Sequence, residues 1–361
     1  MKGFFALILA VVMVFVLSAC GSGQQQPASQ PEETETTNDN PYANLKIALV
    51  SDTIGTEQFI LQAYNAFMEA ADKYGFQATS IECSDTAQWA EKTRAACVEG
   101  YDLIIGIGWV AAEPFSALAD EFPDVEFAII DTIAPNERIK SIAFNTADGC
   151  YVYGVMIGTA FRDQKLFGCI NNFQQQSNFE YRYGFMEGVK SVIPDAEFIH
   201  NFTNSYSDTS IAYELAIQQQ AAGCKFIFGN VSSSANHGIY QAALDLAAKG
   251  TPIYTSGLSV DQTTPDNPYI LGGLTKNTGV CTTMIIEDFL KGNHKGGAHI
   301  LGFKEGAFGV VNISPEGANY WNDEIMNEEV MAAGRAAAEA IRSGKIVIEV
   351  PLEQEWANSN K

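Results

Sequence analysis

Short apolar segments alternate with amphipathic segments along the chain from residue 45 onward. "LKIALVS" (45–51) is a short run of strand-forming residues. After it, apolar residues from Ile60 to Tyr74 recur at steps of three and four, which predicts one face of a helix, and Gly75 follows where a helix typically ends. The pattern continues with predicted strands at 76–83, 101–109, 125–132 and 140–146 and predicted helices at 86–100 and 113–123.

A second cycle of the same kind follows an apolar helix predicted at 148–161. Its strands are predicted at 165–172, 196–203, 225–231 and 252–258, and its helices at 180–193, 209–223 and 238–250. Continuous apolar strands between amphipathic helices are typical of parallel sheets that are covered on both faces. The sequence therefore predicts the α/β class, with two Rossmann-like lobes.

The length of this region also favours two lobes, because about 315 residues exceed what one hydrophobic core usually serves. We expect the N-terminal lobe at 45–145 with a returning segment at about 259–306. The C-terminal lobe is expected at 146–258 with a returning segment at about 307–350. Chain crossings that form a hinge are expected near 144–148, 257–262 and 303–308.

The first residues predict export. Phe4 to Leu17 form an apolar segment of signal-peptide length after Lys2, too short for a comfortable bilayer span. The following Leu17-Ser18-Ala19-Cys20 resembles the lipobox of bacterial lipoproteins. We therefore predict a signal peptide over 1–19, a lipidated Cys20, and a flexible tether over 20–44. The protein would then be lipid-anchored in the cell membrane, facing the extracellular or periplasmic side. An ordinary secretory signal with an incidental cysteine is the alternative.

Charge and composition narrow the choice of partners. The formal net charge of −22 argues against nucleic acid, whose phosphates would be repelled, although solubility alone explains such acidity. Six widely spaced cysteines remain after Cys20, and both disulfides and free buried thiols are open. The four histidines show no zinc-type spacing, so no metal and no cofactor is predicted.

Polar, aromatic or glycine residues follow the predicted strands one after another. They are Asp52, Gly106 to Trp109, Asp131, Asn171 and Asn172, Tyr206 to Asp208, Ser232 to Asn236, and Ser256 to Ser259. Ligands of open parallel sheets bind beyond the carboxyl ends of the strands. If the two lobes face each other, these residues line one cleft.

Several segments resemble the basic membrane protein family. They include "DLIIGIGWVAAEPFSALADEFPDVEFAIIDT", "NTADGCYVYGVMIGTAF", "YGFMEGVKSV" and "GLTKNTGV", and the likeness covers nearly all of residues 45–345. The resemblance implies a type I periplasmic-binding fold and the role of a nucleoside-binding lipoprotein of an ABC importer. It also implies a purine base held between two aromatic rings, with carboxylates and a lysine on the base edge and the ribose.

The resemblance assigns roles to particular residues. Asp52 matches the acid after the first strand, Asp131 the acid that accepts hydrogen bonds from the base, and Lys276 the lysine that reaches the ribose. Tyr206 stands near the second-lobe aromatic of the family. Trp109, directly after "GIG", is placed to stack on a ligand.

The chain departs from the family pattern in three loops. "TEQFILQ" replaces the first-lobe motif, so that only Gln62 aligns and Phe59 becomes the candidate aromatic. In "GLSVDQ", Ser259 replaces an acid and Asp261 remains, which removes one strong acceptor for the ribose. "SSSANHG" replaces a glycine-rich loop of the second lobe.

Other interpretations of these residues and of the whole chain stay open. Asp131 and Asn236 fit as turn and helix caps, and Phe59 and Tyr206 fit as core aromatics. No nucleophile stands beside His237, no acid cluster has metal-binding spacing, and no catalytic residue is predicted. We therefore expect a binding protein and not an enzyme, with permease subunits as partners. A receptor for a sugar or signalling molecule on the same fold is the alternative, and a nucleoside hydrolase is the alternative from another class.

Overall fold

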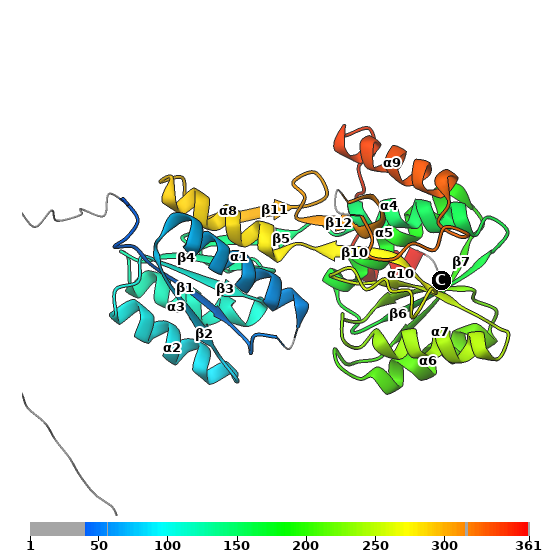
Figure 1. The fold of residues 1–361 in the computed structure, drawn as a ribbon, viewed down its shortest axis with the longest axis horizontal. Helices are drawn as coiled ribbons and strands as arrows, with labels where there is room; N and C mark the ends of the chain where they lie inside the picture. Colours follow the sequence, from blue (N-terminus) through cyan, green and yellow to red (C-terminus); the bar gives the residue numbers. More distant parts are fainter. Residues whose placement is uncertain (1–39, 56, 315–316, 360–361) are drawn as a thin grey trace, which may run out of the picture. The chain divides into compact units, whose positions relative to one another are not determined.

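The computed structural model describes residues 40–55, 57–314 and 317–359, and this part of the chain forms two α/β lobes (Figure 1). The predicted signal peptide and Cys20 lie outside the described residues. The first lobe contains a six-stranded sheet in the order β11-β5-β4-β3-β1-β2, and every pair in it is parallel. Its strands are β1 (Lys46–Ser51), β2 (Gln77–Glu82), β3 (Leu103–Ile107), β4 (Glu126–Ile130), β5 (Lys140–Phe144) and β11 (Gly297–Leu301).

Helices cover both faces of the first sheet because alternate strand residues point to opposite sides. Ile47 and Leu49 share a core with α1 (Gln58–Tyr74) and α8 (Thr278–Leu290). Ala48 and Val50 share a second core with α2 (Thr86–Val98) and α3 (Ala112–Glu121). A short 3₁₀ turn, η1 (Trp109–Ala111), precedes α3.

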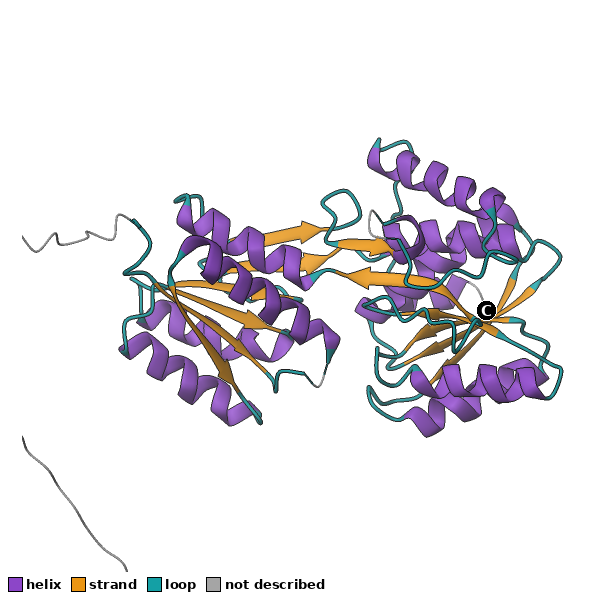
Figure 2. Cartoon of the chain, in the orientation of Figure 1, coloured by secondary structure: helices purple, strands orange, loops and turns teal. Residues whose placement is uncertain are grey.

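The second lobe repeats this plan with the sheet order β12-β10-β9-β8-β6-β7. Its strands are β6 (Leu166–Asn171), β7 (Glu197–Phe202), β8 (Phe226–Asn230), β9 (Tyr254–Gly257), β10 (Ile270–Lys276) and the antiparallel β12 (Phe308–Val310). Its helices are α4 (Ala147–Ala160), α5 (Gln176–Val192), α6 (Thr209–Ala221), α7 (His237–Ala248), α9 (Glu328–Arg342) and α10 (Glu353–Ser359), with a 3₁₀ turn η2 (Val311–Ile313). Figure 2 shows the sheet between the α6–α7 pair and the α4–α5–α9 group.

Close packing of α4 on α5 explains the glycines of the apolar helix that the sequence predicted. A Cβ atom at Gly154 would lie 2.3 Å from the carbonyl oxygen of Phe185, and one at Gly188 would lie 2.1 Å from that of Tyr151. Only residues without a side chain allow this approach, so the glycines fix the contact between the two helices.

The chain passes between the lobes three times, after β5, after β10 and after β11. The second passage differs from the one expected near 257–262. β10 pairs with β9 and β12, so the second sheet extends to Lys276 and only then does the chain return to α8. Gly272 and Gly273 form an irregularity in β10, with φ of 88° and 149°, and this glycine pair hid the strand in the sequence.

The folded region also begins five residues earlier than expected. Asn40 to Lys361 form one compact unit. The side-chain amide of Asn40 donates to the carbonyl oxygen of Tyr74 at 2.9 Å, and Tyr42 packs edge-on against the Tyr74 ring. These contacts tie 40–44, the end of the predicted tether, to the first lobe.

The cysteines of the described region are free thiols. All six (Cys83, Cys97, Cys150, Cys169, Cys224 and Cys281) are buried. Burial raises the pKa of each thiol, for Cys83 and Cys97 to about 11, which keeps the thiols protonated and unreactive. Of the two possibilities that the sequence left open, the structure has the free thiols.

No helix in the described residues is both long and apolar enough to cross a membrane.

Candidate functional site

The carboxyl edges of the two sheets face each other. Glu57 lies in the loop after β1, and Ser233 and Ser234 lie in the loop after β8. The Ser233 and Ser234 hydroxyls donate to the two carboxylate oxygens of Glu57 at 2.6 and 2.8 Å. These bonds join a strand-end loop of one lobe to a strand-end loop of the other, at the carboxyl edges where ligands of such sheets bind.

An ion pair lies where the chain passes from the second lobe to the first. Lys276 is the last residue of β10, and its Nζ lies 2.7 Å from Oδ1 of Asp131, which directly follows β4. The side chain of Lys276 is 14% exposed and that of Asp131 is 30% exposed. Burial disfavours the ammonium, but Asp131 and Tyr181 outweigh that cost and hold the pKa of Lys276 above its usual value.

Aromatic rings surround the Lys276 ammonium. The ring centroids of Phe144, Phe59 and Tyr181 lie 5.0, 5.6 and 5.9 Å from Nζ. Each ring face attracts a cation, and together the rings exclude water from it. Burial raises the pKa of Tyr181 to about 12, so its hydroxyl stays protonated.

The backbone is strained on both sides of this pair. Asp131 has φ of 83° and Ser259 has φ of 70°, both in the left-handed region that residues other than glycine rarely adopt. The carbonyl oxygen of Ser259 accepts from the backbone N–H of Lys276 at 3.0 Å. Conformations that cost about 1–2 kcal/mol gather at sites where the direction of a side chain matters. Here they aim the Asp131 carboxylate at Lys276.

Three other residues of the predicted binding set line a cavity whose lining includes neither Lys276 nor Asp131. Gln62, Ser259 and Asp261 border a space of about 460 Å³ together with Thr275 and Asn277. Because successive strand residues point to opposite sides, Lys276 points away from this cavity. Asp261 also accepts from the backbone N–H and the hydroxyl of Thr263 and from the N–H of Asn319, so its carboxylate anchors loops of its own lobe.

The remaining candidates lie exposed on the carboxyl edges. Trp109 is 71% exposed and Tyr206 is 48% exposed. The Tyr206 hydroxyl accepts from the side-chain amide of Gln175 at 2.9 Å. Asp52 is exposed as well, and partial burial of its carboxyl raises its pKa. Of the predicted set, the structure therefore brings together the side chains of Phe59, Asp131 and Lys276.

Sequence reasoning missed Glu57 and Tyr181. Glu57 precedes the first helix and looked like an ordinary N-terminal acid. Tyr181 lies within the apolar pattern of α5, where it was indistinguishable from a core aromatic. In hindsight the position of Glu57, in the loop after the first strand, was the available signal.

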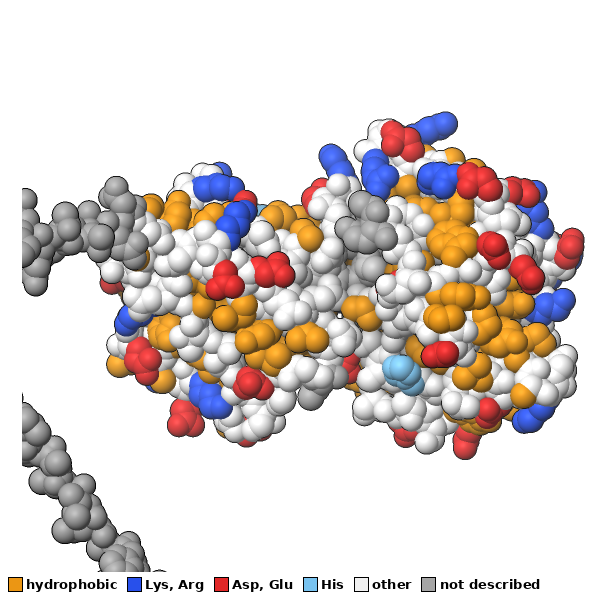
Figure 3. Space-filling model, in the orientation of Figure 1, with side chains coloured by type: hydrophobic (Ala, Val, Ile, Leu, Met, Phe, Trp, Pro, Cys, Tyr) orange, Lys and Arg blue, Asp and Glu red, His pale blue; other side chains and the backbone are white. Residues whose placement is uncertain are grey.

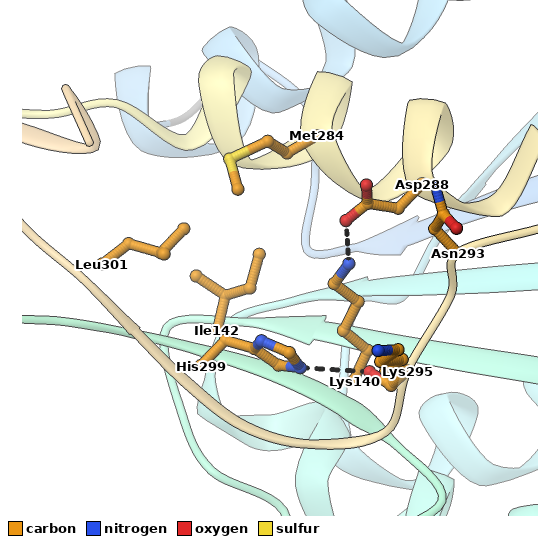
Figure 4. Close-up of a pocket in the computed structure, with 8 residues that line it drawn as sticks. All are labelled: Lys140, Ile142, Met284, Asp288, Asn293, Lys295, His299 and Leu301. Carbon is orange, nitrogen blue, oxygen red and sulfur yellow. Dashed lines mark hydrogen bonds and ion pairs between the residues drawn. The ribbon is translucent and has the colours of Figure 1, made fainter. Parts of the chain in front are cut away.

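A smaller cavity of about 220 Å³ lies within the first lobe, between α8 and the strands β5 and β11 (Figure 4). The buried ammonium of Lys140, at the start of β5, pairs there with Asp288 of α8. Met284, Ile142 and Leu301 form its apolar side. This cavity lies beneath a helix on a face of the sheet and not at the carboxyl edge, and the ion pair holds α8 on the sheet.

Comparison with known proteins identifies the family to which this chain belongs. Residues 45–346 match the Bmp family, described as "ABC transporter substrate-binding protein PnrA-like". A "CD4+ T-cell-stimulating antigen" of Listeria innocua is 25% identical over 277 residues, which cover 72% of this chain and 74% of that protein. The "ABC transporter nucleoside-binding protein BmpA" of Lactococcus lactis is 22% identical, over 94% of this chain and 96% of that one.

A solved structure supports the same fold. The ABC transporter solute-binding protein of Aeropyrum pernix K1 superposes with a TM-score of 0.70 at 20% identity, covering 87% of this chain and 96% of that one. The predicted fold class, two α/β lobes of the type I periplasmic-binding kind, is confirmed. The predicted likeness to the basic membrane protein family is confirmed too, and the chain belongs to this family of ABC transporter substrate-binding proteins, whose members are not enzymes.

Proposed function

We propose that this substrate-binding protein captures a nucleoside, with a purine nucleoside as the first candidate, in the cleft between its lobes. The observation that carries the proposal is the Lys276–Asp131 pair with its surrounding rings. The Lactococcus lactis relative, which is named as nucleoside-binding and matches almost end to end, adds support.

The chemistry of the pair favours a neutral solute over a charged one. Lys276 and Asp131 cancel each other's charge, so an ionic ligand would bring an unpaired charge into a partly buried site. A nucleoside offers hydroxyl and ring oxygens to the ammonium, N–H and O–H donors to the carboxylate, and a flat base to an aromatic ring. One pair can therefore orient both halves of the molecule.

The proposal includes the position of the protein in the cell. Lipidation of Cys20 would hold the lobes at the outer side of the cell membrane, where permease subunits of the importer receive the solute. Incorporation of a labelled fatty acid, lost in Cys20→Ala, tests the anchor directly. Label that persists in that variant would contradict it.

A thermal-shift panel of nucleosides, free bases, sugars and amino acids tests the ligand class. A ligand that binds only the folded protein, at 100 times its Kd, adds about 2.7 kcal/mol to the free energy of unfolding and raises Tm by about 4 °C in a folded region of this size. We expect this shift with purine nucleosides and its loss in Lys276→Met. Shifts with sugars alone would favour the sugar receptor instead.

A further inference from the structure

The side chain of Glu57, in the first lobe, makes two hydrogen bonds to the second lobe. Its two carboxylate oxygens each accept a hydroxyl, from Ser233 at 2.6 Å and from Ser234 at 2.8 Å. Hydrogen bonds to a carboxylate are about twice as strong as bonds between neutral groups. The partners belong to the segments "TEQFILQ" and "SSSANHG", which the resemblance described above marks as departures from the family pattern.

The side chain of Glu57 is not engaged in capping its own helix. Glu57 occupies the N-cap position of α1, but its carboxylate accepts no N–H of that helix. At the same position of α2 and α6, Asp85 and Asp208 do accept backbone N–H groups of their helices. The Glu57 carboxylate is instead directed to the other lobe, and only its backbone oxygen holds the first turn of α1.

The serine loop that receives Glu57 is held firmly in the second lobe. The carbonyl oxygen of Ser233 accepts from the Gln262 side-chain amide at 2.8 Å, and Gln262 in turn accepts from the Tyr240 hydroxyl at 2.6 Å. The Ser232 hydroxyl, which contacts that of Ser234, donates to the carbonyl oxygen of Tyr206 at 2.6 Å. The loop is therefore organised before Glu57 contacts it, so forming the latch costs little entropy.

We propose that Glu57 is a positioning residue for solute capture: with Ser233 and Ser234 it forms a latch that stabilises the closed arrangement of the lobes without touching the solute. The inference rests on the proposed function, because it assumes a solute held between the lobes. It goes further in assigning part of the closing free energy to the protein's own contacts.

The latch has a measurable consequence for affinity. Two lobes on a hinge exchange between open and closed arrangements. For a solute that needs the closed arrangement, the apparent Kd equals the intrinsic Kd divided by the fraction of protein that is closed. A latch raises that fraction in the ligand-free protein. It also has to break before the solute leaves, so it lowers the dissociation rate more than it changes the association rate.

The test compares Glu57→Ala with the double variant Ser233→Ala/Ser234→Ala in the full chain. A pair of labels, at A117C on α3 and at A248C on α7, reports the distance between the two lobes. The six native thiols of the described residues are buried, so with Cys20 replaced by alanine in every protein the labels attach to the new cysteines. In the ligand-free protein we expect both variants to shift the inter-lobe distance distribution equally toward larger values. Combining the Glu57 and serine substitutions should add no further shift.

Two control variants sharpen the test. Glu57→Gln, which keeps one acceptor oxygen, should restore part of the closed population. Asp72→Ala, which removes the same charge from an exposed position of α1, should leave the distribution unchanged.

Solute dissociation provides the second readout. With the nucleoside that the panel identifies, Glu57→Ala should raise the dissociation rate about tenfold and leave the association rate within about twofold. A loss of affinity in Glu57→Ala that the serine variant does not share, with unchanged distances in the ligand-free protein, would mean that Glu57 binds the solute itself, and the latch would be wrong. Because the distance measurement needs no ligand, it also judges the latch if no nucleoside binds and the proposed function fails.

Discussion

The carboxyl edges of the two sheets carry the same kind of polar residue but differ in how they use it. In the second lobe, Asn171 ends β6 and Asn230 ends β8, and both are at most 2% exposed. The Asn230 amide donates to Oδ1 of Asn171 and to the carbonyl oxygen of Asn178, each at 3.1 Å. In the first lobe, Asp52 and Trp109, which lie one and two residues beyond the ends of β1 and β3, are open to solvent.

This difference shows that a polar strand end is not by itself a binding residue. We expected Asn171 and Asn172 to line the cleft, and the structure buries both in hydrogen bonds that fasten one loop of the second lobe to the next. Buried amides with satisfied partners give a rigid edge. The second lobe is thus a fixed platform, and the exposed side chains that can adapt to a solute lie mainly on the first. In the view of Figure 3, charged side chains of both signs are spread over both lobes, in keeping with solubility as the role of the net charge.

The largest effect on stability is expected at the carboxyl edge of the second-lobe sheet, where Asn230 lies. Asn230→Ala removes two buried hydrogen bonds and takes the donor from the buried Oδ1 of Asn171, which costs about 3 kcal/mol of unfolding free energy. Thermal unfolding of the ligand-free protein should show a fall in Tm of about 4–5 °C. The matched control is Asn65→Ala on the exposed side of α1, where we expect almost no change. Equal Tm values in the two variants would mean that the second-lobe edge is not the fixed platform.

The second-largest effect on stability is expected at the Lys276–Asp131 ion pair, and replacing Asp131 should cost more than replacing Lys276. Asp131→Ala leaves the more buried Lys276 without a carboxylate, which costs about 2 kcal/mol, whereas Lys276→Met leaves a carboxylate that water still reaches and costs less. The double variant should recover most of the loss, and solute affinity should fall in all three. Denaturant unfolding separates these values. A double variant as unstable as the sum of the singles would show that the two groups act independently.

A third prediction concerns pH and the buried side of the second lobe. His200 on β7 lies among Arg182 and Lys190 of α5 and Trp356 of α10. Burial and then these two cations lower the pKa of His200 to about 4, against 6.5 in the unfolded chain. The unfolded state therefore binds a proton first as the pH falls, so stability is full above pH 6.5 and is lost between about 6.5 and 4.

Replacing the imidazole should remove this dependence. In His200→Phe, the part of the stability lost from pH 7 to pH 4 should shrink by about 3 kcal/mol, because nothing at that position titrates. Tm measured across this range is the readout. Parallel pH profiles for the two proteins would contradict the lowered pKa. The buried Arg182–Glu353 pair nearby is unchanged by the substitution and so is common to both profiles.

The sequence predicted the alternation of strands and helices because burial leaves a periodic mark on each local segment. α2, α4 and β5 begin within one residue of where the pattern placed them. β10 was missed because two glycines interrupted its apolar run. The Lys276–Asp131 contact joins residues 145 apart, and the Glu57–Ser233 contact joins residues 176 apart. Local periodicity carries no information on such pairings. The resemblance to a family assigned Asp131 and Lys276 to the binding site, but only the structure showed that they pair with each other and that Glu57 contacts Ser233.

The smallest effect on stability is expected at the open edge, and it sharpens the comparison most. Trp109→Ala should change the free energy of unfolding by less than about 0.5 kcal/mol, because the side chain is 71% exposed. If its ring covers one face of a bound base, the same substitution raises Kd at least tenfold, whereas Trp109→Phe keeps a ring and most of the affinity. Titration calorimetry with the solute found in the panel measures the Kd of both variants.

Asn230→Ala, measured alongside, should show the reverse: a large loss of stability and, at a temperature where it is folded, a Kd close to that of the parent. Unchanged affinity in Trp109→Ala would leave Phe59, beside Lys276, as the aromatic of the first lobe that meets the base.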